Sequence, residues 1–187
     1  MRFATITSLF AAAALGLPAD VENPIFGKVI DPASLNQGDG FYLSVPNKEG
    51  VAEVTFTPIA EFGNLKTRAT EDLAHPAKLF ERQSGVSCAG ISSNLGNLDE
   101  ANRQLARNAH ATGHYNRGTR GWVRIDRELA FFCNYERASY TYDYVIGFHI
   151  NVSNRCGQAG YGFQRRGDEW NSDVAVGRTF DGDRFCW

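Results

Sequence analysis

The pattern of apolar and polar positions along this 187-residue chain predicts a β-hairpin in the first half. Two segments, Gly40–Val45 and Val51–Thr57, are rich in aromatic and β-branched residues that partly alternate with polar ones. The intervening Pro46–Gly50 consists of residue types that favour turns. We therefore expect two antiparallel strands over residues 40–57.

A helical pattern begins near Asn97 and ends near Ala111. Asn97 is a residue type that caps helix N-termini, and two acidic residues follow it, where the helix dipole is positive. Gly113 is expected to end the helix. By helical spacing the core face consists of Leu98, Ala101, Leu105 and Ala109, with Arg103, Arg107 and Asn108 outside.

After this helix the pattern indicates strands. We expect them at residues 121–125, 129–135, 140–152 and 173–180. One helix packed on an antiparallel sheet, an α+β fold, fits this order of elements.

The N-terminus has the form of a secretory signal peptide. Met1 and Arg2 precede an apolar run from Phe3 to Leu17, and Leu17-Pro18-Ala19 ends it with small residues. The run is shorter than the roughly 20 residues that a membrane-spanning helix needs. We therefore predict a signal peptide at 1–19, a secreted product and no membrane span.

Composition changes abruptly at Arg82. All four cysteines and all three tryptophans follow it, whereas all six prolines and all four lysines precede it. Residues 20–82 carry ten acidic and six basic side chains, a net charge of −4, whereas residues 83–187 carry eleven acids and twelve arginines, a net charge of +1. The two parts are expected to be a pro-segment and a mature domain.

The junction itself resembles a processing site. Leu79-Phe80-Glu81-Arg82 is similar to the Leu-x-x-Arg sequence at which fungal proteases of the kexin type release secreted proteins from their pro-domains. Cleavage there would leave Gln83 as the new N-terminus. The predicted organisation is a signal peptide at 1–19, a pro-segment with a β-hairpin at 20–82 and a mature domain at 83–187. A two-domain protein with an exposed linker here is the alternative.

The cysteines predict a disulfide-stabilised domain, because a secreted domain of about 105 residues buries a limited core. Each bond would stabilise it by roughly 3 to 4 kcal/mol. The sequence leaves all three pairings of the four cysteines open. Zinc is disfavoured because no Cys-x-x-Cys pair occurs. The cysteines are Cys88, Cys133, Cys156 and Cys186.

Enzymatic chemistry finds little support in the sequence. It contains no Gly-x-Ser-x-Gly, His-Glu-x-x-His or phosphate-binding loop, and a formal net charge of −2 does not favour nucleic acid. His110 and His114 lie at a helix end without an acidic residue between them, so we expect no metal site and no cofactor. A secreted ribonuclease would need His149, Glu136 and Arg124 to converge.

Binding is the favoured interpretation. Tyr140, Tyr142 and Tyr144 would share one face of the strand predicted at 140–152, and aromatic residues beside arginines such as Arg124 are typical of interfaces. Half-buried tyrosines of an ordinary sheet are the alternative. Asn151-Val152-Ser153 is an N-glycosylation sequon, which places Asn151 at the surface as a glycosylation candidate.

Leader, processing site, acidic pro-segment and cysteine-paired domain together resemble the organisation of secreted effectors of filamentous fungi, including host-selective toxins of cereal pathogens. Val86-Ser87-Cys88, the helix after it, Arg155-Cys156-Gly157 and the terminal cysteine are faintly similar to killer-toxin-like and necrosis-inducing proteins. This resemblance implies a non-enzymatic virulence factor that binds a host plant protein in the apoplast or cytosol. A secreted ribonuclease and an antimicrobial protein are the alternatives.

Overall fold

The computed structural model describes residues 25–27, 35–60, 85–167 and 173–186, which form an α+β fold with a large antiparallel sheet and two helices. The predicted signal peptide and the predicted processing site Leu79–Gln83 lie outside these residues, as do Trp170 and Trp187. Among the described residues, no helix is both long and apolar enough to cross a membrane. The elements are β1 (Gly40–Pro46), β2 (Ala52–Pro58), β3 (Val86–Ile91), α1 (Leu95–Thr112), β4 (His114–Tyr115), β5 (Arg120–Ile125), β6 (Glu128–Asn134), β7 (Ala138–Ser139), α2 (Tyr142–Cys156), β8 (Gly160–Gly167) and β9 (Asp173–Phe180).

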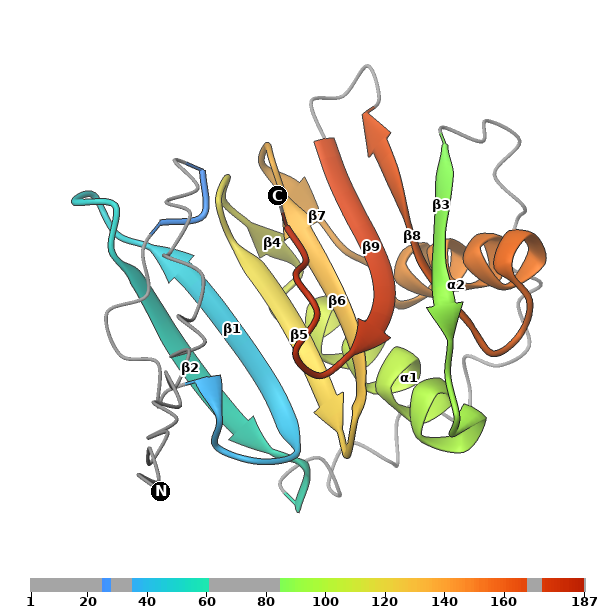
Figure 1. The fold of residues 1–187 in the computed structure, drawn as a ribbon. Coiled ribbons are helices and arrows are strands. Elements are labelled where there is room, and N and C mark those ends of the chain that lie inside the picture. The colour runs from blue at the N-terminus through green and yellow to red at the C-terminus, as the bar shows by residue number, and fades with distance from the viewer. Residues whose placement is uncertain (1–24, 28–34, 61–84, 168–172, 187) are drawn as a thin grey trace, which may run out of the picture.

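The main sheet has seven strands in the order β2-β1-β5-β6-β9-β8-β3, and every neighbouring pair is antiparallel. Both helices lie on one face, behind the sheet in Figure 1, while the C-terminal tail crosses the other face. Strands β4 and β7 form a separate two-stranded pair. The sheet therefore has a helix side and a tail side.

The hairpin predicted at 40–57 is confirmed as β1 and β2. The side chain of Asn47 holds their turn, because its Oδ1 atom accepts hydrogen bonds from the backbone N–H groups of Glu49 and Val51, each at 3.0 Å. Strand β1 also pairs with β5, with Tyr42 opposite Trp122. The hairpin is thus built into the sheet that the later residues form.

Helix α1 confirms the predicted core face, because Leu98, Ala101, Leu105 and Ala109 are fully buried. It begins two residues earlier than predicted. The N-cap is Asn94, whose Oδ1 atom accepts the Asn97 backbone N–H at 3.1 Å. Gly113 ends the helix as expected, with φ 77°, a conformation that glycine adopts without strain. Asn108, predicted to face outward, is buried and its side-chain amide donates to the carbonyl of Gln104.

The strand predicted at 140–152 is wrong, since residues 142–156 form the second helix, α2. Thr141 caps it by accepting the Tyr144 backbone N–H at 3.2 Å. Its buried apolar residues are Val145, Phe148 and Val152, at spacings of three and four that suit one face of a helix. The strands predicted at 121–125, 129–135 and 173–180 are confirmed as β5, β6 and β9.

Two disulfides cross-link the fold: Cys88–Cys156 joins the edge strand β3 to the end of α2, and Cys133–Cys186 joins β6 to the C-terminal tail. Cys133 and Cys186 are buried, whereas Cys88 is exposed and Cys156 is half-buried. The disulfide framework predicted from the sequence is confirmed, and its pairing is resolved.

A buried arginine donates hydrogen bonds at the C-terminal end of helix α2. Arg178 of β9 is 1% exposed, and its guanidinium donates to the carbonyls of Gly160, Gly157 and Gln158 and to the hydroxyl of Ser153. A cation here complements the negative end of the helix dipole. Burial lowers the pKa of Arg178. This single side chain ties β9 to the end of α2 and to the turn before β8.

Candidate functional site

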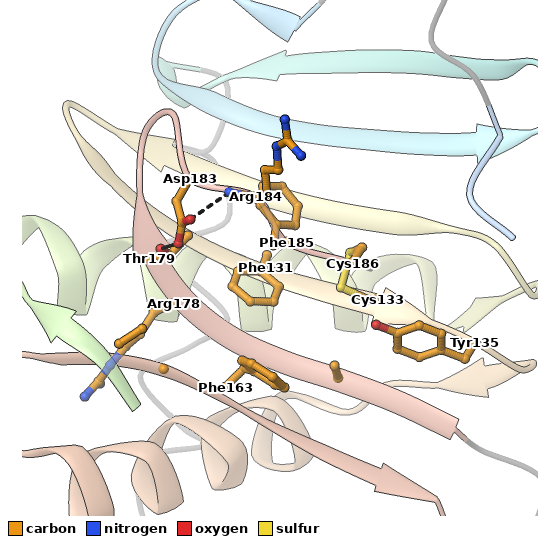
Figure 2. Close-up of a pocket in the computed structure, with 13 residues that line it drawn as sticks. Phe131, Cys133, Tyr135, Phe163, Arg178, Thr179, Asp183, Arg184, Phe185 and Cys186 are labelled. Carbon is orange, nitrogen blue, oxygen red and sulfur yellow. Dashed lines mark hydrogen bonds between the residues drawn. A yellow bond between two sulfur atoms is a disulfide. The ribbon is translucent and has the colours of Figure 1, made fainter. Parts of the chain in front are cut away.

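The tail side of the sheet carries a groove beside the C-terminal tail, residues 181–186 (Figure 2). The Cys133–Cys186 disulfide anchors the tail to β6. Phe185 stacks on Phe131 with ring centroids 4.7 Å apart and meets the edge of Trp122 at 5.7 Å. We call this feature the tail-side groove. Its lining includes Phe131, Cys133, Tyr135, Phe163, Ala175 and Asp183.

The floor of the tail-side groove is apolar and depends on a glycine. A side chain at Gly177 of β9 would meet the Phe163 Cβ atom at 2.4 Å and the Phe131 ring at 2.8 Å. Glycine therefore allows the two phenylalanines to come together over β9. The resulting cavity has a volume of about 150 Å³, which suits the insertion of a single side chain from a partner better than the enclosure of a whole small molecule.

Polar groups of both signs lie at the rim. At one end, Asp183 accepts hydrogen bonds from the Thr179 hydroxyl and, at 2.8 Å, from the Arg184 backbone N–H (Figure 2). This ordered carboxylate fixes the direction of the tail, and the Arg184 side chain is exposed. The side chain of Arg178 points away from the groove (Figure 2), toward the helix side.

At the other end, Arg165 forms a two-point ion pair with Asp173, with N–O distances of 2.9 and 2.7 Å. Its guanidinium lies 3.9 Å from the centre of the Tyr135 ring. The hydrogen bonds that Arg165 donates to Asp173 raise the pKa of Arg165, and burial raises the pKa of Tyr135. The tail-side groove therefore offers an apolar floor between two polar rims.

The structure does not place the predicted tyrosine surface on one strand. Tyr140 is 2% exposed and donates a hydrogen bond to the Asn134 side chain, while Tyr142 and Tyr144 are half-buried in the first turn of α2. Arg124 lies on the tail side and contacts Asn36, Asp39 and Asp181. The four residues therefore do not form one stripe, because the segment is helical and the sheet separates Arg124 from the tyrosines.

The three residues that a ribonuclease would need are not brought together. Arg124 lies opposite Leu129 near the start of β6, whereas Glu136 follows the other end of that strand. The seven residue steps from Leu129 to Glu136, at about 3.4 Å each, span up to about 24 Å. His149 is on the helix side, 4% exposed, and burial together with the nearby Arg178 charge lowers its pKa to about 3.

The burial of His149 leads us to predict that the free energy of unfolding falls in acid. Its unfolded pKa is near 6.5, so between pH 6.5 and 3 the unfolded chain binds a proton that the folded protein does not. The free energy of unfolding should therefore fall by about 1.4 kcal/mol per pH unit below pH 6.5 through this residue. His149→Leu should remove that contribution while changing stability at pH 7.5 little, because neither ring nitrogen has a hydrogen-bond partner among the described residues. Urea unfolding at pH 4 to 7.5 measures both, and parallel pH profiles for the two proteins would refute the assignment.

Asn151 is not at the surface, contrary to the sequence-based expectation. It lies within α2, is 9% exposed, and its side-chain nitrogen donates to Gln164 at 2.9 Å. A glycan on that nitrogen would displace the helix from β8. We predict that the protein secreted by a glycosylating host carries no N-linked glycan, so its mass does not shift on endoglycosidase treatment. An N-linked glycan at Asn151 in folded protein would contradict the buried placement.

Metal ligands do not gather in the part of the chain that the structure describes, where no group of three or more His, Cys, Asp or Glu residues could hold an ion. His110 is exposed in the last turn of α1, and His114 is paired through Nδ1 with the Ser139 hydroxyl at 2.7 Å.

Comparison with known proteins finds no matching family model, no curated protein and no solved structure. Apart from Cys133 and Cys186, which were predicted as disulfide cysteines, the groove residues were not identified from the sequence. Their one sequence signal is Phe185 beside Cys186, an aromatic residue that a disulfide would hold in place.

Proposed function

We propose that this protein is a secreted fungal effector, released by cleavage after Arg82, that acts by binding a host plant protein through the tail-side groove. The observation that carries the proposal is the groove itself. It combines an apolar floor, aromatic residues and charged rims, the composition that protein interfaces favour.

The groove is also fixed before a partner arrives. A disulfide holds the tail, and Phe185 is packed against Phe131. The Asp183 carboxylate accepts one hydrogen bond from Thr179 of the sheet and one from Arg184 of the tail. Fewer side chains then lose freedom on binding, which favours affinity. The leader, the Leu79-x-x-Arg82 sequence and the absence of lysine from residues 83–187 support a secreted protein that acts on a host, in the apoplast or the cytosol.

Infiltration of the purified, processed protein into leaves of many plant genotypes tests the proposal. Cell death, or suppression of defence, in some genotypes and not in others is the expected result, since a host-protein target varies between genotypes. The same response in every genotype, or none in any, would refute it. Parallel assays of RNA hydrolysis and of growth inhibition in other fungi identify the ribonuclease and the antimicrobial alternatives.

A further inference from the structure

We infer that the β1–β2 hairpin stays bound after cleavage, so that the working protein has two chains: an N-terminal fragment that includes residues 25–58 and a C-terminal fragment that begins at Gln83. This inference rests on the proposed cleavage after Arg82. The interaction surface is the outer edge of β5, and its occupant is the hairpin of the same chain.

The backbone provides the first argument. Strand β1 is an interior strand, paired with β2 on one side and with β5 on the other, with Gly40–Ser44 opposite Arg120–Arg124. Neither pairing uses a residue between Pro58 and Arg120, so a cut after Arg82 leaves both in place. Loss of the hairpin would turn β5 into an unpaired edge, which promotes aggregation.

Side chains from the N-terminal segment fill both faces of the sheet. Tyr42 is fully buried and stacks on Trp122, with centroids 5.1 Å apart and planes at 1°. Phe41 belongs to the core on the helix side, and the fully buried Phe26 meets the edge of the Tyr135 ring at 5.3 Å. Each buried aromatic side chain covers about 150 to 250 Å². These three residues are core of the fold and not a detachable cover.

Polar contacts fix the hairpin at the turn between β5 and β6. Asp39 Oδ1 accepts the Asp126 backbone N–H at 2.9 Å, where Asp126 has φ 56°, and lies 3.7 Å from Arg124 Nε. Arg124 Nη1 also donates to Asn36 Oδ1 at 2.9 Å. Both Asn36 and Asp39 belong to the N-terminal segment, so the turn of the C-terminal fragment is completed by the other fragment.

Gly118 of the C-terminal fragment is also packed closely against the N-terminal segment. A Cβ atom at this position, which precedes β5, would lie 2.2 Å from the Ile25 carbonyl oxygen and 2.7 Å from Pro46. The C-terminal fragment therefore has a surface shaped to the N-terminal segment at two separate points. Backbone pairing, aromatic packing, polar contacts and this fit together argue for retention.

The experiment uses the full chain with a recognition sequence for a specific protease inserted after Arg82. After complete cutting, the two fragments should co-elute at equal stoichiometry in gel filtration and separate only in denaturant. Elution of the N-terminal fragment by itself in native buffer would overturn the inference.

Two variants test whether the contacts described above hold the two fragments together after cutting. Tyr42→Ala should speed dissociation of the cut protein about tenfold or more, because it removes the stack on Trp122. Glu53→Ala, at an exposed position of β2, should not. Equal dissociation rates for these variants would also overturn the inference.

Cellular cleavage is tested separately, by the denatured mass of the secreted product. A single uncut chain there would refute processing after Arg82 and leave the engineered-cut result to decide retention by itself.

Discussion

Replacing Arg178 by methionine is expected to lower the free energy of unfolding by about 3 to 5 kcal/mol, the largest effect of any single substitution that we predict. Methionine keeps much of the arginine stem but no donors. The carbonyls of Gly157, Gln158 and Gly160 then lose the hydrogen bonds that Arg178 donates to them at the end of α2. Urea unfolding followed by tryptophan fluorescence measures the loss.

Arg165→Met is the matched control, since it removes an arginine from the adjacent strand β8. Arg165 has an ion pair too, but its side chain is 49% exposed. Exposed pairs contribute about 0 to 1 kcal/mol, so this variant should remain near wild-type stability. Similar losses for both arginines would show that the Arg178 contacts do not hold α2 in place.

The second large effect concerns the disulfides. Cys133→Ser/Cys186→Ser and Cys88→Ser/Cys156→Ser should each destabilise the protein by about 4 kcal/mol, because the bonds close chain segments with separations of 53 and 68 residues. Only the first pair anchors the tail beside the tail-side groove. We therefore expect that variant to lose host activity at temperatures where it is still folded, and the second variant to keep it.

Mild reduction gives an independent check of the same difference. Cys88 is exposed, so Cys88–Cys156 should be reduced before the buried Cys133–Cys186 bond in native buffer, as alkylation and mass spectrometry would reveal. Reduction of the buried bond first would contradict the difference in exposure between the two disulfides. Equal loss of activity in both double variants would contradict the role of the tail as a groove wall.

Local patterns predicted the hairpin, helix α1 and strands β5, β6 and β9. Helix α1 follows the helical period, whereas β6 and β9 are short segments buried on both faces, which their length and composition identify as strands. Helix α2 was not predicted, because its tyrosines and β-branched residues favour strands when taken one by one. Its start signal, Thr141 followed by Asp143, and the buried spacing of Val145, Phe148 and Val152 were present in the sequence.

Glycines within strands and the order of strands in the sheet explain what the sequence did not predict. Strands β3 and β8 contain glycines, such as Gly90 and Gly162, that weaken any alternating pattern. The groove combines Phe131, Phe163 and Gly177 from three strands because β9 inserts between β6 and β8, an order that does not follow the sequence. Disulfide pairing depends on the same sheet order, so local reasoning left it open.

Leaf response to groove variants tests the central claim most directly. In a responsive genotype, Phe163→Glu, which places a charge on the groove floor, and Arg184→Glu, at its exposed rim, should reduce activity at least about tenfold per mole of folded protein. Ile91→Glu introduces the same charge at an apolar residue of β3 that is 76% exposed, outside the groove, and should remain fully active. Full activity of both groove variants, confirmed as folded by circular dichroism, would contradict the claim that this protein binds its host partner through the tail-side groove.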